Sequence, residues 1–173
     1  EIINNPLVTF GKRKYILIEF NVYDIPQAQK QVLYDLKIQG VTPIIAHPER
    51  YKQVQENIFL VYEWLNSGCL IQVDAGSLIG TLGKKSKIAA EKIINNQWCQ
   101  ILGSDAHDNM KRNFCLKEAY EIVQKMVGEN YANPLVYNNP RLVIEGKSID
   151  VDFEPIELES ETFWQKLVRR INN

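Results

Sequence analysis

The chain has 173 residues, of which 45% are hydrophobic and 24% charged, and its formal net charge is −1. This composition is typical of a globular domain with a sizeable core, and the near-zero charge argues against nucleic acid or an anionic membrane as an obligatory partner. The three cysteines are scattered, which favours a reducing, cytoplasmic setting over a disulfide framework, and no apolar run is long enough for a membrane span.

The first half of the chain alternates aliphatic runs with stretches of helical spacing. Residues 14–20 are aliphatic and β-branched and predict a buried strand. Residues 26–39 open with a proline, carry apolar residues near helical spacing and end before Gly40, so we expect a helix. Residues 41–46 predict the next strand, and residues 56–66 predict the next helix.

The second half continues this alternation. We expect strands over residues 69–73 and 99–102 and helices over residues 84–95, 116–127 and 139–145. A glycine-rich loop is expected between the first of these strands and the first of these helices. Alternation of this kind predicts an α/β fold with parallel strands joined by flanking crossover helices.

Acidic or imidazole side chains follow the predicted strands at intervals of about 30 residues, which is the length of one strand–helix unit. These residues are Glu19, His47, Asp74, Asp105 and His107. In a parallel βα barrel the carboxyl ends of the strands meet on one face, where active sites lie. Carboxylates and imidazoles gathered in one cavity are costly unless a cation holds them, and this donor set suits Zn, Mn or Fe better than Mg or Ca alone.

The two histidines strengthen the metal hypothesis. A single histidine is more often structural, but the only two in the chain, His47 and His107, both follow predicted strands. Asp105 and His107 form an Asp-x-His pair, and residues i and i+2 of an extended backbone point the same way. We therefore expect both side chains to reach one metal.

The segment His47-Pro48-Glu49-Arg50 has two compatible interpretations. In the structural one, a helix begins here, with Pro48 in its first turn and Glu49 favourable to its dipole. In the functional one, His47 is a metal ligand and Arg50 clamps phosphate with its planar fork. Arg112 is either a second clamp or a solvated loop residue.

Two further alternatives stay open from the residues alone. Asp74 either caps a turn or binds a metal, and Ser77 with its neighbouring glycines either binds phosphate through backbone amides or closes a loop. One rival chemistry is excluded, because none of the three cysteines is followed six residues later by an arginine, as a thiol-based tyrosine phosphatase requires.

Three segments together resemble one known family. Residues 40–51 (Gly-Val-Thr-Pro-Ile-Ile-Ala-His-Pro-Glu-Arg-Tyr), 72–83 and 103–107 follow the order and spacing of the bacterial PHP-type (polymerase and histidinol phosphatase-like) protein-tyrosine phosphatases of capsular and exopolysaccharide operons. The resemblance covers residues 7–145. It implies a partial or distorted (β/α) barrel and a multinuclear metal centre that prefers Mn²⁺, with Fe or Zn as alternatives. The implied substrate is a phosphorylated tyrosine kinase, or its tyrosine-rich tail, that controls polysaccharide synthesis; homo-oligomers are a further expectation.

The resemblance also assigns roles to single residues. The implied metal ligands are Glu19, His47, Asp105 and His107, and the arginines implied to handle phosphate are Arg50 and Arg112. The family begins with a His-x-His strand and a further ligand glutamate that this sequence does not contain before Glu19. We therefore expect the N-terminal third to be missing and the metal centre to be incomplete. The alternatives are a catalytically impaired binding or regulatory fragment, or a PHP phosphoesterase for a small phosphate, which the His-Pro-Glu-Arg-Tyr context disfavours.

The chain is expected to divide near residue 150. Residues 1–150 form the phosphatase-like domain, and residues 151–173 form an acidic linker and a C-terminal amphipathic helix. Phe163, Leu167 and Ile171 share one face of that helix. It either packs on its own barrel or docks on a membrane-associated kinase or another subunit.

Overall fold

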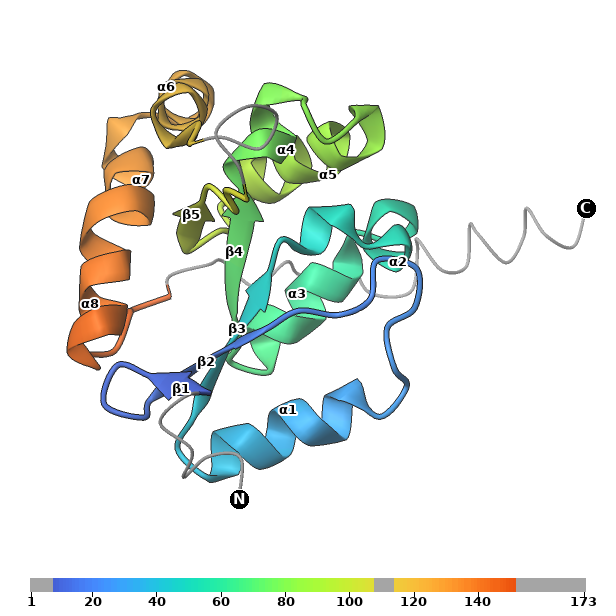
Figure 1. The fold of residues 1–173 in the computed structure, drawn as a ribbon, viewed down its shortest axis with the longest axis vertical. Helices are drawn as coiled ribbons and strands as arrows, with labels where there is room; N and C mark the ends of the chain where they lie inside the picture. Colours follow the sequence, from blue (N-terminus) through green and yellow to red (C-terminus); the bar gives the residue numbers. More distant parts are fainter. Residues whose placement is uncertain (1–7, 108–113, 152–173) are drawn as a thin grey trace, which may run out of the picture.

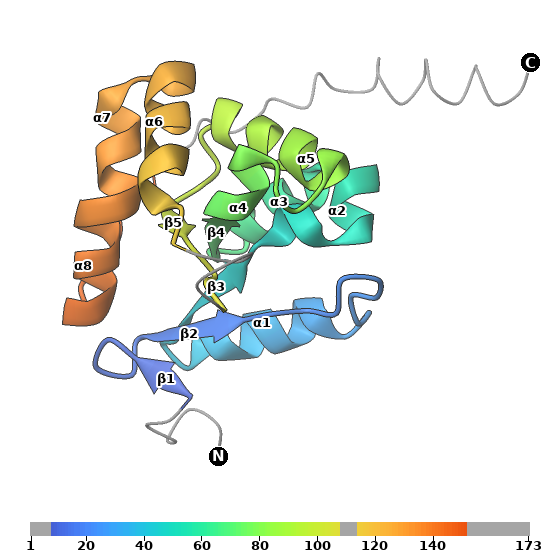
Figure 2. The same ribbon diagram turned by 45° about the horizontal axis from the view of Figure 1, so that its top comes forward.

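The computed structural model describes residues 8–107 and 114–151 and contains a five-stranded sheet in the order β1-β2-β3-β4-β5. The strands are β1 (Thr9–Phe10), β2 (Tyr15–Ile18), β3 (Thr42–Ala46), β4 (Leu70–Asp74) and β5 (Ile101–Gly103). Strands β2 to β5 are parallel, whereas β1 folds back on β2 as an antiparallel hairpin at one edge (Figure 2). The predicted α/β fold with parallel strands is confirmed, and the two-residue β1 is too short to leave a sequence pattern.

Helical segments connect and flank these strands. They are α1 (Gln29–Ile38), η2 (Pro48–Arg50), α2 (Lys52–Glu56), α3 (Phe59–Asn66), α4 (Ala75–Ile79), α5 (Lys84–Asn95), α6 (Leu116–Val127), α7 (Glu129–Asn133), η3 (Pro134–Asn138) and α8 (Asn139–Glu145). Helices α3 and α8 lie on opposite sides of β3 and β4 (Figure 1). No described helix is long and apolar enough to cross a membrane.

The central strands β3 and β4 are buried on both faces, because helices cover each of them, whereas Leu17 of β2 is 49% exposed. Ile45 and Ile71 belong to the larger core cluster, which includes side chains of α3, α4, α5 and α6. Their neighbours Ile44 and Leu70 point to the other face, where Val143 of α8 covers them. Successive strand residues point to opposite faces, so a parallel strand covered on both sides reads as a continuous apolar run.

The glycine-rich segment after β4 begins with the helix α4, so the predicted loop is wrong over residues 75–79 and is found only over residues 80–83. Asp74 is the N-cap of α4, and its Oδ1 accepts a hydrogen bond from the Gly76 N–H at 2.7 Å. Gly80 ends the helix at φ 95°, in the left-handed region that glycine adopts without a steric penalty. A Cβ on Gly76 would lie 3.1 Å from Thr81 Oγ1, so this mid-helix glycine reflects close packing rather than a loop.

The helix predicted over residues 56–66 also differs from the structure. It is divided at Asn57, whose extended backbone (φ −139°, ψ 95°) ends α2 and whose Oδ1 accepts from the Phe59 N–H at 3.2 Å. The buried residues of α3 are Val61, Tyr62, Trp64 and Leu65, whereas Phe59 at its start is 39% exposed. A short Asx turn at Asn57 sets where α3 begins and therefore which of its side chains are buried. The spacing of apolar residues alone does not reveal this turn.

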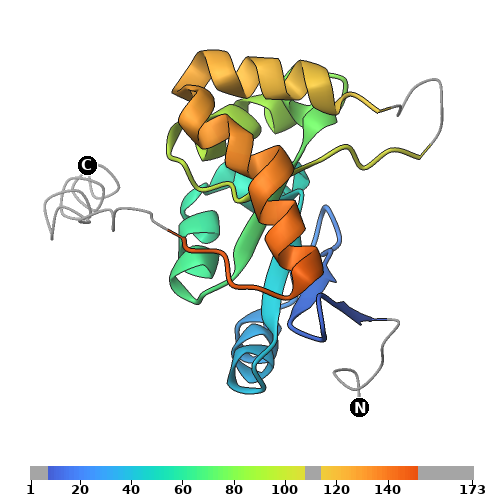
Figure 3. The ribbon, with the colours of Figure 1, turned by 90° about the vertical axis from the view of Figure 1, so that its left-hand side faces the viewer.

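The chain returns to the sheet after α8. Helices α7, η3 and α8 follow one another as one long helical stretch beside the sheet (Figure 3). Beyond them, the Tyr15 hydroxyl donates to the Lys147 carbonyl at 2.6 Å, and Lys14 Nζ donates to Ser148 Oγ at 2.7 Å. Arg112 and the C-terminal helix predicted within residues 151–173 lie outside the described residues.

Candidate active site

Four of the side chains that follow the strands surround one cavity. Glu19, His47, Asp74 and Asp105 come from the ends of β2, β3, β4 and β5 and line a cavity of about 100 Å³. Their sequence separation is large, yet the parallel strands bring them to one edge of the sheet. The predicted convergence of these four residues is therefore present in the structure.

His47 is the most enclosed of the four residues that the family resemblance implies as metal ligands. Its side chain is 6% exposed, its Nε2 lies 3.3 Å from Glu19 Oε1, and its backbone is in the left-handed region at φ 32°. Among the described residues, its buried Nδ1 has no hydrogen-bond partner. Burial, reinforced by the charge of Arg50, lowers the pKa of His47. The neutral imidazole, which is the form that binds metals, is therefore favoured.

Arg50 projects its guanidinium between two carboxylates. Its Nη1 lies 2.8 Å from Asp105 Oδ2 and 3.7 Å from Asp74 Oδ2. The Arg50 side chain is 21% exposed, so it borders both the protein interior and solvent. A guanidinium has five N–H donors in a planar fork and can hold one carboxylate while presenting further donors to phosphate oxygens.

The backbone at Asp105 is not extended, against the expectation for the Asp-x-His pair, although His107 Nδ1 still lies 3.8 Å from Asp105 Oδ1. Asp105 has φ 43°, a left-handed conformation that reverses the chain direction. His107 Nδ1 lies 2.7 Å from the Asp105 backbone carbonyl, and the His107 side chain is 56% exposed. Asp105 lines the cavity and His107 does not. The argument from extended backbone is wrong at this position.

Asp74 and Ser77 both have structural roles in α4. Asp74 is 3% exposed and caps the helix, as the capping interpretation predicted. Ser77 is fully buried, and its hydroxyl donates to Glu49 Oε1 at 2.7 Å. The Ser77 side chain is therefore engaged inside the protein. Phosphate binding through the backbone amides of this segment stays a prediction.

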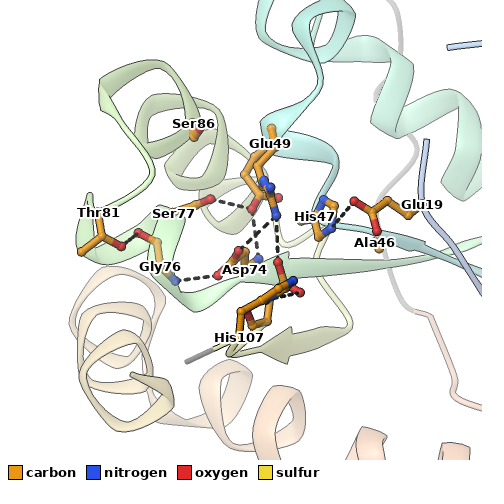
Figure 4. A network of polar contacts seen from close by, with 12 residues as sticks. Glu19, Ala46, His47, Glu49, Asp74, Gly76, Ser77, Thr81, Ser86 and His107 are labelled. Carbon is orange, nitrogen blue, oxygen red and sulfur yellow. Dashed lines mark hydrogen bonds and ion pairs between the residues drawn. The ribbon is translucent and has the colours of Figure 1, made fainter. Parts of the chain in front are cut away.

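Glu49 is a site neighbour whose contacts the sequence did not reveal (Figure 4). It is 0% exposed, and its Oε1 also accepts from the Asp74 N–H at 3.0 Å. Its Oε2 has no hydrogen-bond partner within the described part of the chain. Burial raises the pKa of Glu49 to about 8, with the Ser77 hydrogen bond acting in the opposite direction. The carboxylate contacts the N-terminal region of α4 rather than only its own turn.

Tyr51 joins the ends of β2 and β3 beside the cavity. Its hydroxyl donates to the Ala46 carbonyl at 2.7 Å and accepts from the Phe20 N–H at 3.0 Å. The two bonded residues directly adjoin His47 and Glu19. Tyr51 is 0% exposed, and burial raises its pKa, so the hydroxyl stays protonated. Its place after Arg50 in the sequence gave no sign of this long-range role.

The described residues supply part of a metal site. Glu19, His47 and Asp105 are suitable nitrogen and oxygen donors, and the unpartnered buried Nδ1 of His47 marks an imidazole without a complete set of partners. However, no three His, Cys, Asp or Glu side chains in residues 8–107 and 114–151 are close enough together to hold a metal ion. Donor chemistry fits a metal, and further donors are required to complete its coordination.

Comparison with known proteins identifies the family. The model of the capsular polysaccharide synthesis family CpsB/CapC matches residues 1–145. The chain belongs to the CpsB/CapC family. It is 33% identical over 149 residues to the tyrosine-protein phosphatase YwqE of Bacillus subtilis, covering 86% of this chain and 58% of that protein. It is 37% identical over 119 residues to the putative tyrosine-protein phosphatase CapC of Staphylococcus aureus, covering 69% of this chain and 47% of that protein.

The fold agrees with this CpsB/CapC assignment. A match to the crystal structures of YwqE from Bacillus subtilis and CpsB from Streptococcus pneumoniae, described as unique metal-dependent tyrosine phosphatases, has a TM-score of 0.80 and 32% identity. It covers 87% of this chain and 61% of that chain. The resemblance to the capsular phosphatases and the predicted fold are thus confirmed. The chain spans about half to three fifths of the length of these relatives.

Proposed function

We propose that this chain serves metal-dependent hydrolysis of phosphotyrosine on a tyrosine kinase that regulates capsular or exopolysaccharide synthesis in the cytoplasm. The observation that carries the proposal is the cavity lined by Glu19, His47 and Asp105, with the Arg50 guanidinium beside it. Relatives named tyrosine-protein phosphatases support the substrate class. Family membership in capsular polysaccharide synthesis supports the choice of a kinase in that system, or its tyrosine-rich tail, as partner.

Each site residue has a proposed role. Glu19, His47, Asp105 and His107 hold the metal, with Mn²⁺ preferred and Fe or Zn as alternatives. The metal, when bound, supplies Lewis acidity at the phosphate oxygens. Arg50, together with Arg112, orients those oxygens and stabilises their negative charge. The neutral imidazole of His47 offers its lone pair, and the Asp105 carboxylate directs the Arg50 fork toward the cavity edge.

A second candidate is a catalytically impaired binding or regulatory fragment. The observation that favours it is the lack, within the described ranges 8–107 and 114–151, of three suitably close donor side chains. In this case the cavity binds a phosphorylated segment without hydrolysing it. Residues 1–150 remain the proposed phosphatase domain, and residues 151–173 the proposed linker and docking helix, in either case.

One experiment separates these functions. The chain is loaded separately with Mn²⁺, Zn²⁺ and Fe²⁺, its metal content is measured by mass spectrometry, and hydrolysis of a phosphotyrosyl peptide is compared with that of histidinol phosphate. We expect bound metal and a preference for the peptide, both lost in His47→Ala and both kept in the control Thr81→Val. Peptide binding without hydrolysis supports the regulatory fragment. Absence of both metal and peptide binding contradicts the proposed function.

A further inference from the structure

A buried carboxylate lies in the turn between two proposed site residues, and no role proposed above uses it. Glu49 belongs to η2, directly before Arg50 and two residues after His47, and it is 0% exposed. Burying a polar carboxyl group is costly unless it is hydrogen-bonded, and Oε2 of Glu49 has no hydrogen-bond partner within the described part of the chain. If this position only had to fill space in the core, an apolar side chain would do so without this cost. The contacts of Glu49 therefore require an explanation beyond core filling.

The Glu49 carboxylate connects its turn to two other elements. Oε1 accepts from the Asp74 N–H at the end of β4 (3.0 Å) and from the Ser77 hydroxyl in α4 (2.7 Å). On the opposite side of the turn, Gln55 Nε2 donates to the Glu49 carbonyl at 2.9 Å and lies 3.3 Å from Ser86 Oγ of α5. The turn is thus held by β4 and α4 through the Glu49 side chain, and by Gln55 of α2 through the Glu49 carbonyl, with Ser86 of α5 next to the same Gln55 amide.

The residues on either side of Glu49 need such support. His47 holds a left-handed backbone conformation at φ 32°, which is unfavourable for a residue with a Cβ and persists only where its surroundings impose it. Arg50 must aim its guanidinium across the cavity edge to Asp105 on another strand. The three-residue η2 is too short to fix either side chain by itself.

We propose that Glu49 is a positioning residue, whose hydrogen bonds to Asp74 and Ser77 hold the turn that places His47 and Arg50 at the cavity. The effect of Glu49 on catalysis rests on the proposed phosphatase function. Its effect on the positions of His47 and Arg50 does not depend on that function. Glu49 touches neither substrate nor metal in this role. It acts through the backbone of η2.

The test uses the fact that the chain has only two histidines. The imidazole resonances of His47 and His107 are recorded by NMR for the whole chain and for the variants Ser77→Ala, Glu49→Gln and Glu49→Leu. The matched control is Thr81→Val, which also removes a hydroxyl bonded within this region, from Thr81 Oγ1 to the Gly76 carbonyl at 3.1 Å, without touching Glu49. His107 lies 3.8 Å from Asp105, the ion-pair partner of Arg50, so its resonances can respond as well, and the Thr81→Val spectrum is the reference.

We expect Ser77→Ala and Glu49→Leu to shift the His47 resonances by more than Thr81→Val does. Glu49→Gln keeps the size and one carbonyl acceptor, so it should stay closest to the parent spectrum. In a phosphatase assay, Ser77→Ala should lower kcat by about tenfold with little change in KM, because misplaced groups act mainly on the chemical step. If Glu49→Leu does not fold, Ser77→Ala still decides the question, because it removes a single hydrogen bond.

The result that overturns the proposal is a lower melting temperature in Ser77→Ala with His47 resonances at their parent positions, which is what a purely structural carboxylate produces. Failure of the proposed function looks different. In that case no phosphatase activity is found in any form of the chain, while the His47 resonances still respond to Ser77→Ala. The spectra and the assay therefore report on the two hypotheses separately.

Discussion

Arg50 and Asp105 form the ion pair on which the proposed chemistry depends most directly. Their side chains are 21% and 29% exposed, and their closest atoms are 2.8 Å apart. A pair that borders solvent contributes little to stability, about 0–1 kcal/mol, so a planar fork at this position is better explained by phosphate binding. A lysine at this position would keep the positive charge but would lack the planar array of N–H donors of the guanidinium.

Arg50→Lys should therefore lower kcat/KM for a phosphotyrosyl peptide by about 100-fold, the effect of removing a preorganised donor to transition-state charge. The free energy of unfolding in urea should change by less than about 1 kcal/mol. Arg141→Lys is the matched control, because Arg141 is 75% exposed and forms its ion pair with Glu145 of its own helix α8, at 3.2 Å. Equal kinetics for the two variants would remove Arg50 from the proposed site.

The cysteines give a second prediction at the residue scale. Cys69 and Cys99 are each 1% exposed, and burial raises the pKa of both thiols to about 12. Cys115 is partly exposed, and burial raises its pKa by a smaller amount. Only the thiolate reacts with a disulfide reagent, and a raised pKa keeps the thiol protonated at higher pH.

Ellman's reagent should therefore label only Cys115 in the native chain at pH 8, and the rate should still increase with pH above 9. All three thiols should react after unfolding in guanidinium chloride. Mass spectrometry of the labelled peptides identifies the sites. Native labelling of Cys69 or Cys99 would show that the core around β4 and β5 opens more readily than its burial indicates.

Tyr51 makes a prediction at the scale of whole elements, because its hydroxyl joins the ends of β2 and β3. Tyr51→Phe leaves the Ala46 carbonyl and the Phe20 N–H without this partner. The free energy of unfolding should fall by about 1–3 kcal/mol, the cost of leaving buried polar groups unsatisfied. Urea unfolding measures the change. Tyr23→Phe, at a side chain that is 79% exposed, should leave the stability unchanged, and a similar loss in both variants would contradict the proposed link.

Local signals predicted some elements well and others not at all. Helices α5 and α6 have the predicted bounds, because each has a strong apolar face and a glycine or asparagine at its end. Helix α4 was predicted as part of a loop, because Gly76 lies within it and Gly80 follows it, whereas its cap and tight packing depend on Asp74 and Thr81 in three dimensions. Sequence pattern thus identifies long amphipathic helices and fails for a five-residue helix fixed by tertiary contacts.

At the scale of the whole molecule, the sheet explains which parts of the site were predictable. Residues that follow parallel strands must meet at one edge, so Glu19, His47 and Asp105 could be placed together from their spacing. The left-handed turn at Asp105 could not be foreseen, and it leaves the His107 side chain 56% exposed beside Asp105 rather than in the cavity lining. The contacts of Glu49 link segments far apart in sequence, and no local pattern encodes such a pairing.

The last prediction concerns where the folded unit ends. After α8, the Lys147 carbonyl accepts from the Tyr15 hydroxyl, Ser148 bonds Lys14, and Val151 packs against the core. The segment 146–151 is therefore part of the folded unit, which places the proposed boundary of the phosphatase-like domain close to Val151. A chain cut after Val151 keeps these contacts, whereas a chain cut after Glu145 loses all of them.

Truncation after Val151 should therefore change the melting temperature by no more than about 2 °C, whereas truncation after Glu145 should lower it by about 5 °C or more, as expected for losses above 1 kcal/mol in a domain of this size. Differential scanning calorimetry of the three chains measures both values, and far-UV circular dichroism confirms that each is folded. Truncation after Glu145 also uncovers Tyr15, which is 1% exposed in the fold, so its hydroxyl should become accessible to solvent. A large loss on removal of residues 152–173 alone would show that this tail packs on the domain, and the proposed division into domain and linker would then be wrong.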